Sequence, residues 1–162
     1  MLFAAVLLLV PRVGPQDESS YADQRNGLLA DGPSVPPSLD GIDFGGQVSA
    51  LLFVRARPSS ALVAGWHAAL AAAVRAWVVV QAGAQEQATP VGERPARVAG
   101  LPVVLDAGQV LSRAVGLPRP NDGAPGVGYA VVDRQRQVRY STLDPSWPSN
   151  GFEVATISGA LL

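Results

Sequence analysis

The sequence predicts a three-layer α/β/α sandwich with a mixed central sheet, closed by a C-terminal β-hairpin and a helix. Three observations support this fold class. From residue 47 onward, short β-branched apolar runs alternate with Ala- and Leu-rich stretches, which is typical of layered α/β domains. Two apolar runs near the C-terminus flank a short polar turn and so predict a hairpin. The 162 residues, 48% of them hydrophobic, are enough for one domain with a sizeable core.

The elements follow in the order β-α-β-loop-β-α-β-β-α. The first strand is uniformly apolar, as expected for a strand buried on both faces. Pro58 followed by serines marks a helix start, and Ala and Leu predict a long helix after it. Gly116 is placed to end the next helix. The predicted strands are Val48–Val54, Trp77–Gln81, Leu101–Asp106, Val127–Asp133 and Gln137–Leu143; the predicted helices are Ser60–Ala76, Ala107–Val115 and Asn150–Leu162, with loops at Ala82–Ala99 and Leu117–Gly126.

The N-terminal part of the chain differs from the rest. Residues 1–12 form an apolar segment whose core, residues 1–10, is too short for the roughly 20 residues of a membrane-spanning helix. It has the length of a signal-peptide hydrophobic region but lacks preceding basic residues. We expect membrane association through residues 1–10 and a membrane-associated or extracytoplasmic location, with a short strand in a cytoplasmic protein as the alternative. Residues 13–46 predict a polar linker with a short helix at Gln16–Ala30, and residues 47–162 the folded domain.

The composition excludes several classes of function. The formal net charge is −1, so no overall field attracts nucleic acid, and we expect no nucleic-acid partner. The chain has no cysteine, which excludes disulfides and cysteine-ligated zinc or iron–sulfur sites. The closest pair of carboxylates that could begin a metal site, Asp40 and Asp43, is more typical of a turn. We therefore expect no metal and no cofactor.

Three segments carry a family resemblance. LLFVRARPSSALVAGW has the form of an apolar strand, a short loop and a helix, and LPVVLDAGQVLSRAVGL that of a strand, an Asp and a helix ending in Gly. VGYAVVDRQRQVRYSTLDP has the form of a closing hairpin. In this order the segments resemble the thioredoxin-like superfamily, especially its peroxiredoxin (AhpC/TSA) and membrane-tethered thioredoxin branches. The resemblance covers Gly46–Leu162 and implies a thioredoxin-like fold.

The chain departs from this family at its redox site. The resemblance places two cysteines at the N-terminus of the first helix, where the helix dipole and free N–H groups stabilise a thiolate. Here Pro58 and Ala61 occupy those positions, with Ser59 and Ser60 between them, and a hydroxyl forms no disulfide. We expect no catalytic residue in this degenerate redox site. The family's cis-proline would fall near Val127, and Pro125 lies two residues earlier.

These departures predict a redox-inactive binding or scaffold module. Its protein partner would lie in a groove at the degenerate redox site, with Arg55, Arg57, Pro125 and Val127 as candidate binding residues. Arginines beside a helix N-terminus can bind an anion or a carboxylate, although two solvated loop arginines are the alternative. An enzyme remains the second hypothesis: an oxidoreductase or peroxiredoxin-type protein that works through partner thiols or a cofactor. A degraded gene product without activity is the third.

Other chemistry is excluded by spacing. Ser60 and His67 are seven residues apart, so a helix separates them by about 10 Å along its axis, whereas a Ser–His pair needs roughly 3 Å. Gly123–Gly128 reads GAPGVG, but it precedes a strand, whereas phosphate-binding loops follow a strand and open a helix. Asp106 and Asp133 end predicted strands, and we expect each to cap a helix or begin a turn.

Overall fold

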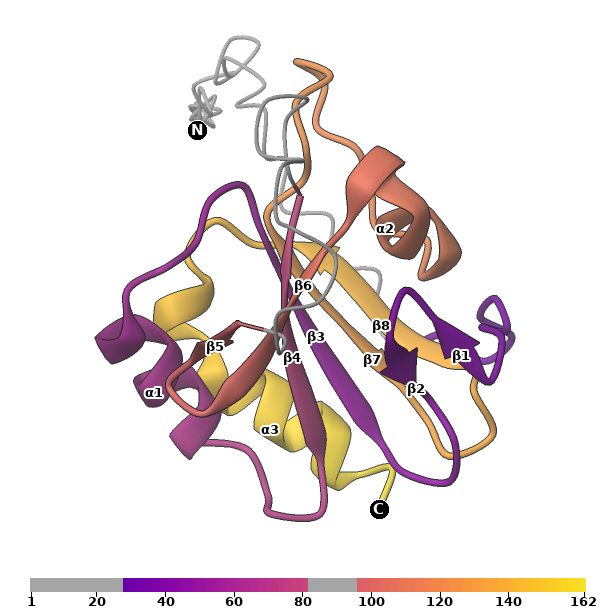
Figure 1. Ribbon diagram of the computed structural model, residues 1–162. Coiled ribbons are helices and arrows are strands. Elements are labelled where there is room, and N and C mark those ends of the chain that lie inside the picture. Colours follow the sequence, from indigo (N-terminus) through magenta and orange to yellow (C-terminus); the bar gives the residue numbers. More distant parts are fainter. Residues whose placement is uncertain (1–27, 82–95) are drawn as a thin grey trace, which may run out of the picture.

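A six-stranded mixed sheet forms the centre of the computed structural model, which describes residues 28–81 and 96–162 (Figure 1). Three sequence predictions fall largely outside these residues: the apolar segment 1–12, the short helix at 16–30 and the loop at 82–99. Within the described residues, no helix is long and apolar enough to cross a membrane.

The sheet has the strand order β5-β6-β4-β3-β7-β8. β3 pairs in parallel with β4, and β4 with β6; α1 lies in the connection that returns the chain from the end of β3 to the start of β4. β7 and β8 run antiparallel and form the predicted hairpin. The sheet strands are β3 (Ser49–Val54), β4 (Arg75–Val80), β5 (Arg97–Val98), β6 (Leu101–Leu105), β7 (Gly128–Val132) and β8 (Val138–Leu143).

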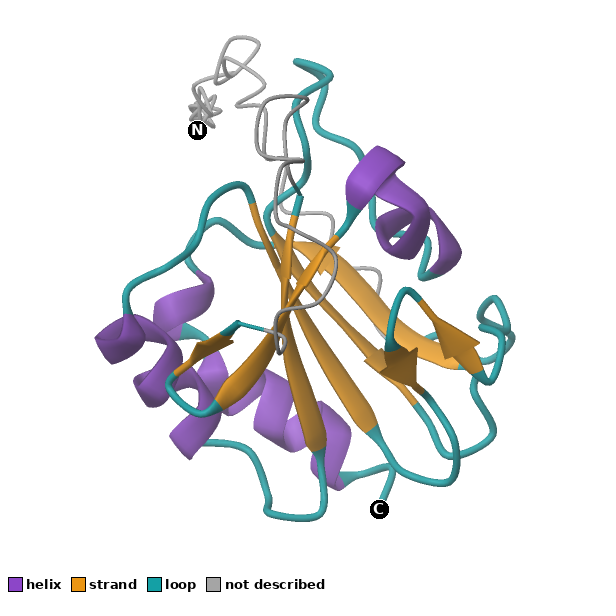
Figure 2. Ribbon diagram, in the orientation of Figure 1, coloured by secondary structure: helices purple, strands orange, loops and turns teal. Residues whose placement is uncertain are grey.

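Helices cover both faces of the sheet, as Figure 2 shows. α1 (Ser60–Ala68) and α3 (Gly151–Gly159) lie on one face, where Trp66 and Val154 are fully buried against it. α2 (Val110–Ala114) lies on the other face and contributes the fully buried Leu111 to a second core. Each such side chain contributes roughly 1.5–3 kcal/mol by leaving water. The layers, the mixed sheet and the closing hairpin and helix confirm the predicted thioredoxin-like α/β/α sandwich.

The first helix is shorter than predicted. α1 ends at Ala68 rather than Ala76, and the last residues of the predicted helix belong to a turn and to β4. Ala and Leu favour a helix locally, but Arg75 is the register partner of Ser49 in the parallel β3–β4 ladder. Pairing over six residues on each strand therefore overrides helix propensity at this point.

The second helix is split. A short 3₁₀ turn, η1 (Ala107–Gln109), precedes α2, and its residues Gly108 and Gln109 have φ angles of 71° and 59°. The predicted continuous helix at 107–115 is thus interrupted at its first turn. Its predicted end is confirmed, because Gly116 has a φ of 63°, a left-handed conformation that glycine adopts without strain.

Residues 28–46 contribute to the second core. β1 (Ser38–Leu39) and β2 (Ile42–Asp43) form a separate two-stranded ladder. Ile42 is fully buried, and Val35 and Phe44 are each 1% exposed. Part of the stretch predicted as a polar linker therefore covers the α2 face of the sheet.

Candidate functional site

Three polar residues line up where the parallel strands end. The last residues of β3, β4 and β6 are register partners in the parallel ladders. The residues that directly follow them are Arg55, Gln81 and Asp106. Backbone bonds hold them in line, because Gln81 N donates to the Val54 carbonyl at 2.9 Å and Asp106 N to the Val80 carbonyl at 2.9 Å. Since successive side chains alternate between faces, all three point toward the α2 side. We call this line and residues 57–61 and 117–127 beside it the carboxyl edge.

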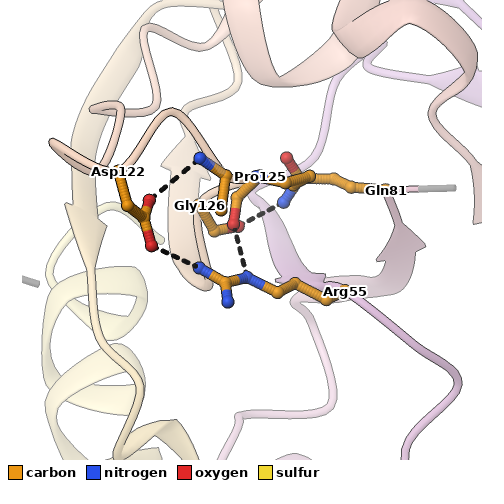
Figure 3. Close-up of polar contacts among 6 residues, drawn as sticks. Arg55, Gln81, Asp122, Pro125 and Gly126 are labelled. Carbon is orange, nitrogen blue, oxygen red and sulfur yellow. Dashed lines mark hydrogen bonds and ion pairs between the residues drawn. The ribbon is translucent and has the colours of Figure 1, made fainter. Parts of the chain in front are cut away.

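The loop at residues 117–126 is anchored to this edge from two strands (Figure 3). Arg55 Nε donates to the Pro125 carbonyl at 2.9 Å, and Gln81 Nε2 donates to the Gly126 carbonyl. Asp122 accepts a 2.9 Å bond from Ala124 N and lies 3.8 Å from the Arg55 guanidinium. The loop is therefore held in one conformation by side chains at the ends of β3 and β4.

The degenerate redox site lies at the N-terminus of α1. Ser59 is the N-cap residue, and its hydroxyl accepts a 3.4 Å bond from Leu62 N. Pro58 is half-buried, while Ser59, Ser60 and Ala61 are exposed. Ser59 thus completes the helix, as the sequence indicates, and the two positions equivalent to the family's cysteines carry a ring and a methyl group.

The other candidate residues separate in space. Arg57 is exposed and donates from Nη2 to the Arg97 carbonyl at 2.7 Å, on the β5 side of the edge. Val127 is half-buried against the α1–α3 core, and its carbonyl accepts from Asp144 N at 2.8 Å. The structure therefore joins Arg55 and Pro125 by a hydrogen bond, whereas Arg57 and Val127 bond to other partners. All described peptide bonds are trans, including those before the prolines at this edge.

Two buried carboxylates at the same edge serve the helices. Asp106, 1% exposed, accepts from Leu111 N at 2.8 Å and from Ser112 N at 3.0 Å, so it holds the first turn of α2. Asp144, also 1% exposed, accepts from Ser146 N at 2.9 Å and from the Asn150 amide at 2.7 Å ahead of α3. The predicted capping role of Asp106 is confirmed. Across 28–81 and 96–162, no three acidic or histidine side chains gather as metal ligands would.

Two tyrosines of β7 and β8 pack in the core between the sheet and the helices α1 and α3. Tyr129 is fully buried and stacks on Tyr140 with ring centroids 5.8 Å apart. Tyr140 donates a 2.6 Å hydrogen bond to Glu153, whereas the Tyr129 hydroxyl lies near the same carboxylate without a hydrogen bond of good geometry. Burial, reinforced by the negative charge of Glu153, raises the pKa of Tyr129 well above its usual value. The Tyr129 hydroxyl therefore stays protonated in the folded protein near neutral pH.

Several residues of the edge escape sequence reasoning. Gln81 stands only as the end of a predicted strand, and Asp122, Ser112 and Arg119 belong to no functional motif. Position is a usable signal for Gln81 alone, because it is a polar residue that directly follows β4, and the ends of parallel strands meet at one edge.

Comparison with known proteins adds fold neighbours. No protein-family model and no curated protein matches the chain. Mycobacterium tuberculosis AhpC is similar over 73% of this chain and 71% of its own, with 17% identity and a TM-score of 0.47. MTB dsbF, solved in mixed oxidized and reduced forms, is similar over 76% of this chain and 90% of its own, with 19% identity and a TM-score of 0.46. A putative thioredoxin from Neisseria meningitidis is similar over 87% of this chain and 91% of its own, with 13% identity and a TM-score of 0.40.

Proposed function

We propose that this thioredoxin-like chain, which has no cysteine, is a non-catalytic binding domain whose partner is an acidic protein segment lying along the carboxyl edge. The observation that carries the proposal is the content of the degenerate redox site. Pro58 and Ala61 stand where thiols would be needed, and neither can form a disulfide or a thiolate. A thiol reaction would need every sulfur atom from other molecules.

The charge of the edge supports an acidic partner. Arg57 is exposed, and its one described hydrogen bond leaves most of its five N–H donors available. The first turn of α1 contains no acidic residue, so the positive end of the helix dipole is not neutralised there. A carboxylate placed between Arg57 and the exposed Ser60 would gain both contributions.

The rigidity of the edge supports binding as well. Bonds from Arg55 to Pro125 and from Gln81 to Gly126 fix the loop at residues 117–126 before any partner arrives. A preformed surface binds with a smaller loss of conformational entropy than one that must be ordered. The anchoring thus favours a recognition surface over a flexible catalytic loop.

A peptide-binding experiment tests this proposal. The full chain is screened against a library of extended peptides of varied charge, and hits are measured by fluorescence anisotropy at two salt concentrations. We expect acidic peptides to bind, more weakly at high salt, and Arg57→Gln to weaken binding several-fold. Arg134→Gln is the matched control, because Arg134 is exposed in the β7–β8 turn at the opposite end of the sheet. Selection of no acidic peptide, or equal affinity of Arg57→Gln and the control, would contradict the proposal.

Membrane association is a further part of the proposal and rests on the apolar composition of residues 1–10. Sedimentation of the full chain with neutral phospholipid vesicles tests it. We expect the protein in the pellet, and a variant with two of these residues changed to Asp in the supernatant. An equal distribution of both proteins would refute this part without touching the peptide-binding surface.

A further inference from the structure

A recessed surface lies on the α2 side of the carboxyl edge. A pocket of about 210 Å³ is enclosed by α2, the anchored loop and the end of β4. Pockets for drug-sized ligands span roughly 300–1,000 Å³, so this one suits a small ligand or one end of a larger one. It is separate from the surface between Arg57 and Ser60, which is not part of its lining.

The chemistry of the lining is that of an oxyanion site. Among the described residues, the pocket is lined by two arginines, Arg113 and Arg119, and by no carboxylate. Arg113 is held in place by its own bonds to the carbonyls of Gln109 and Gly108, which leave part of its guanidinium available. Arg119 is exposed, and no described carboxylate pairs with it. Two positive charges without a counterion beside a pocket favour an anionic occupant.

A hydroxyl group in the same lining adds a hydrogen-bonding group for a ligand. Ser112 is only 6% exposed, and its backbone N–H is used by Asp106. Its hydroxyl makes no hydrogen bond within the described part of the chain, although it lines the pocket. Because it faces the pocket, it can donate to an oxygen atom of a bound ligand.

The walls are rigid enough to act as a preformed site. Asp106 fixes the turn that carries Ser112, and Gln81, itself 3% exposed, fixes the loop through Gly126. The pocket also lies outside the carboxyl ends of β4 and β6, where ligands of open α/β sheets bind. We propose that this pocket binds a small oxyanion, a carboxylate or phosphate group, through Arg113, Arg119 and the Ser112 hydroxyl.

The test is a titration of the full isotope-labelled chain followed by two-dimensional NMR. Inorganic phosphate and acetate are added in separate arms, with sodium chloride at matched ionic strength as a third. We expect saturable shifts of the Ser112 and Gly126 amides and of the Gln81 side-chain amide with at least one oxyanion and not with chloride. Tighter binding of phosphate would identify a phosphoryl ligand, and tighter binding of acetate a carboxylate ligand.

Variants make the result specific to this pocket. Arg119→Gln and Ser112→Ala should each weaken oxyanion binding at least about tenfold, because each removes a hydrogen bond to a charged group. Arg134→Gln removes the same charge at the far end of the sheet and should leave affinity unchanged. Shifts that never saturate, that chloride reproduces, or that persist unchanged in Arg119→Gln would overturn the inference. The peptide-binding proposal is tested by Arg57→Gln and stands or falls separately.

Discussion

Replacing Asp106 should be one of the costliest polar substitutions in this protein. Its two carboxylate oxygens accept separate bonds, from Leu111 N at 2.8 Å to Oδ1 and from Ser112 N at 3.0 Å to Oδ2. Hydrogen bonds to charged groups contribute about 1.5–3 kcal/mol each, so two at the lower limit give about 3 kcal/mol for Asp106→Ala. Asp106→Asn keeps only one acceptor oxygen and should lose about half of that.

Urea unfolding followed by tryptophan fluorescence measures both values, since Trp66, Trp77 and Trp147 are all buried. Asp43→Ala is the matched control: Asp43 also accepts a backbone N–H, from Gly45 at 2.8 Å, but it is exposed. Its replacement should cost less than about 1 kcal/mol. If Asp106→Ala is no more destabilising than Asp43→Ala, then the buried carboxylate does not hold α2 and the wall of the oxyanion pocket is not fixed as argued.

Three further predictions concern the sheet and its helices. Tyr129→Phe should stabilise the protein by about 1 kcal/mol, because it removes a buried hydroxyl that makes no hydrogen bond of good geometry. Tyr140→Phe should destabilise the protein by about 1.5 kcal/mol, because it removes the hydrogen bond to Glu153. Chemical denaturation measures both changes, and the same sign for both would refute this prediction. Because burial raises the pKa of Tyr129 in the folded state, the unfolded state releases the proton first, so stability is intact below about pH 10 and falls above it. Denaturation midpoints between about pH 9 and about pH 11 measure the loss, which should be smaller in Tyr129→Phe. Gly128→Ala should abolish cooperative folding, since a Cβ there would overlap a carbonyl oxygen of β8. Gly65→Ala should stabilise the protein by roughly 0.5–1 kcal/mol, because Gly65 lies inside α1 with open space around it. Thermal melting followed by circular dichroism distinguishes the two variants.

The sequence predicts most of the sheet because its signals are local. The apolar runs at β3, β6 and the β7–β8 hairpin are bounded by Gly, Pro and Asp, and the strands lie within one residue of the predicted limits. The end of α1 is missed because it depends on the pairing of Arg75 with Ser49, a non-local contact. Two-residue strands such as β1, β2 and β5 are too short to produce a period.

The sequence predicts only some of the residues of the candidate site. Arg55 and Pro125 were found because they flank positions given by the family resemblance, and the structure joins them by a 2.9 Å hydrogen bond. Gln81 is far from Ser112 and Arg119 in sequence and meets them only because β4 and β6 end at the same edge. No residue-by-residue pattern encodes that meeting, since it results from strand order.

The central claim is that this chain binds without carrying out thiol chemistry. Insulin reduction in the presence of dithiothreitol tests it most directly, with the purified full chain, a cysteine-containing thioredoxin as positive control and a no-protein blank. The account predicts a rate equal to the blank at every protein concentration, because Pro58 and Ala61 supply no sulfur. A rate that rises above the blank in proportion to the amount of this protein would contradict it.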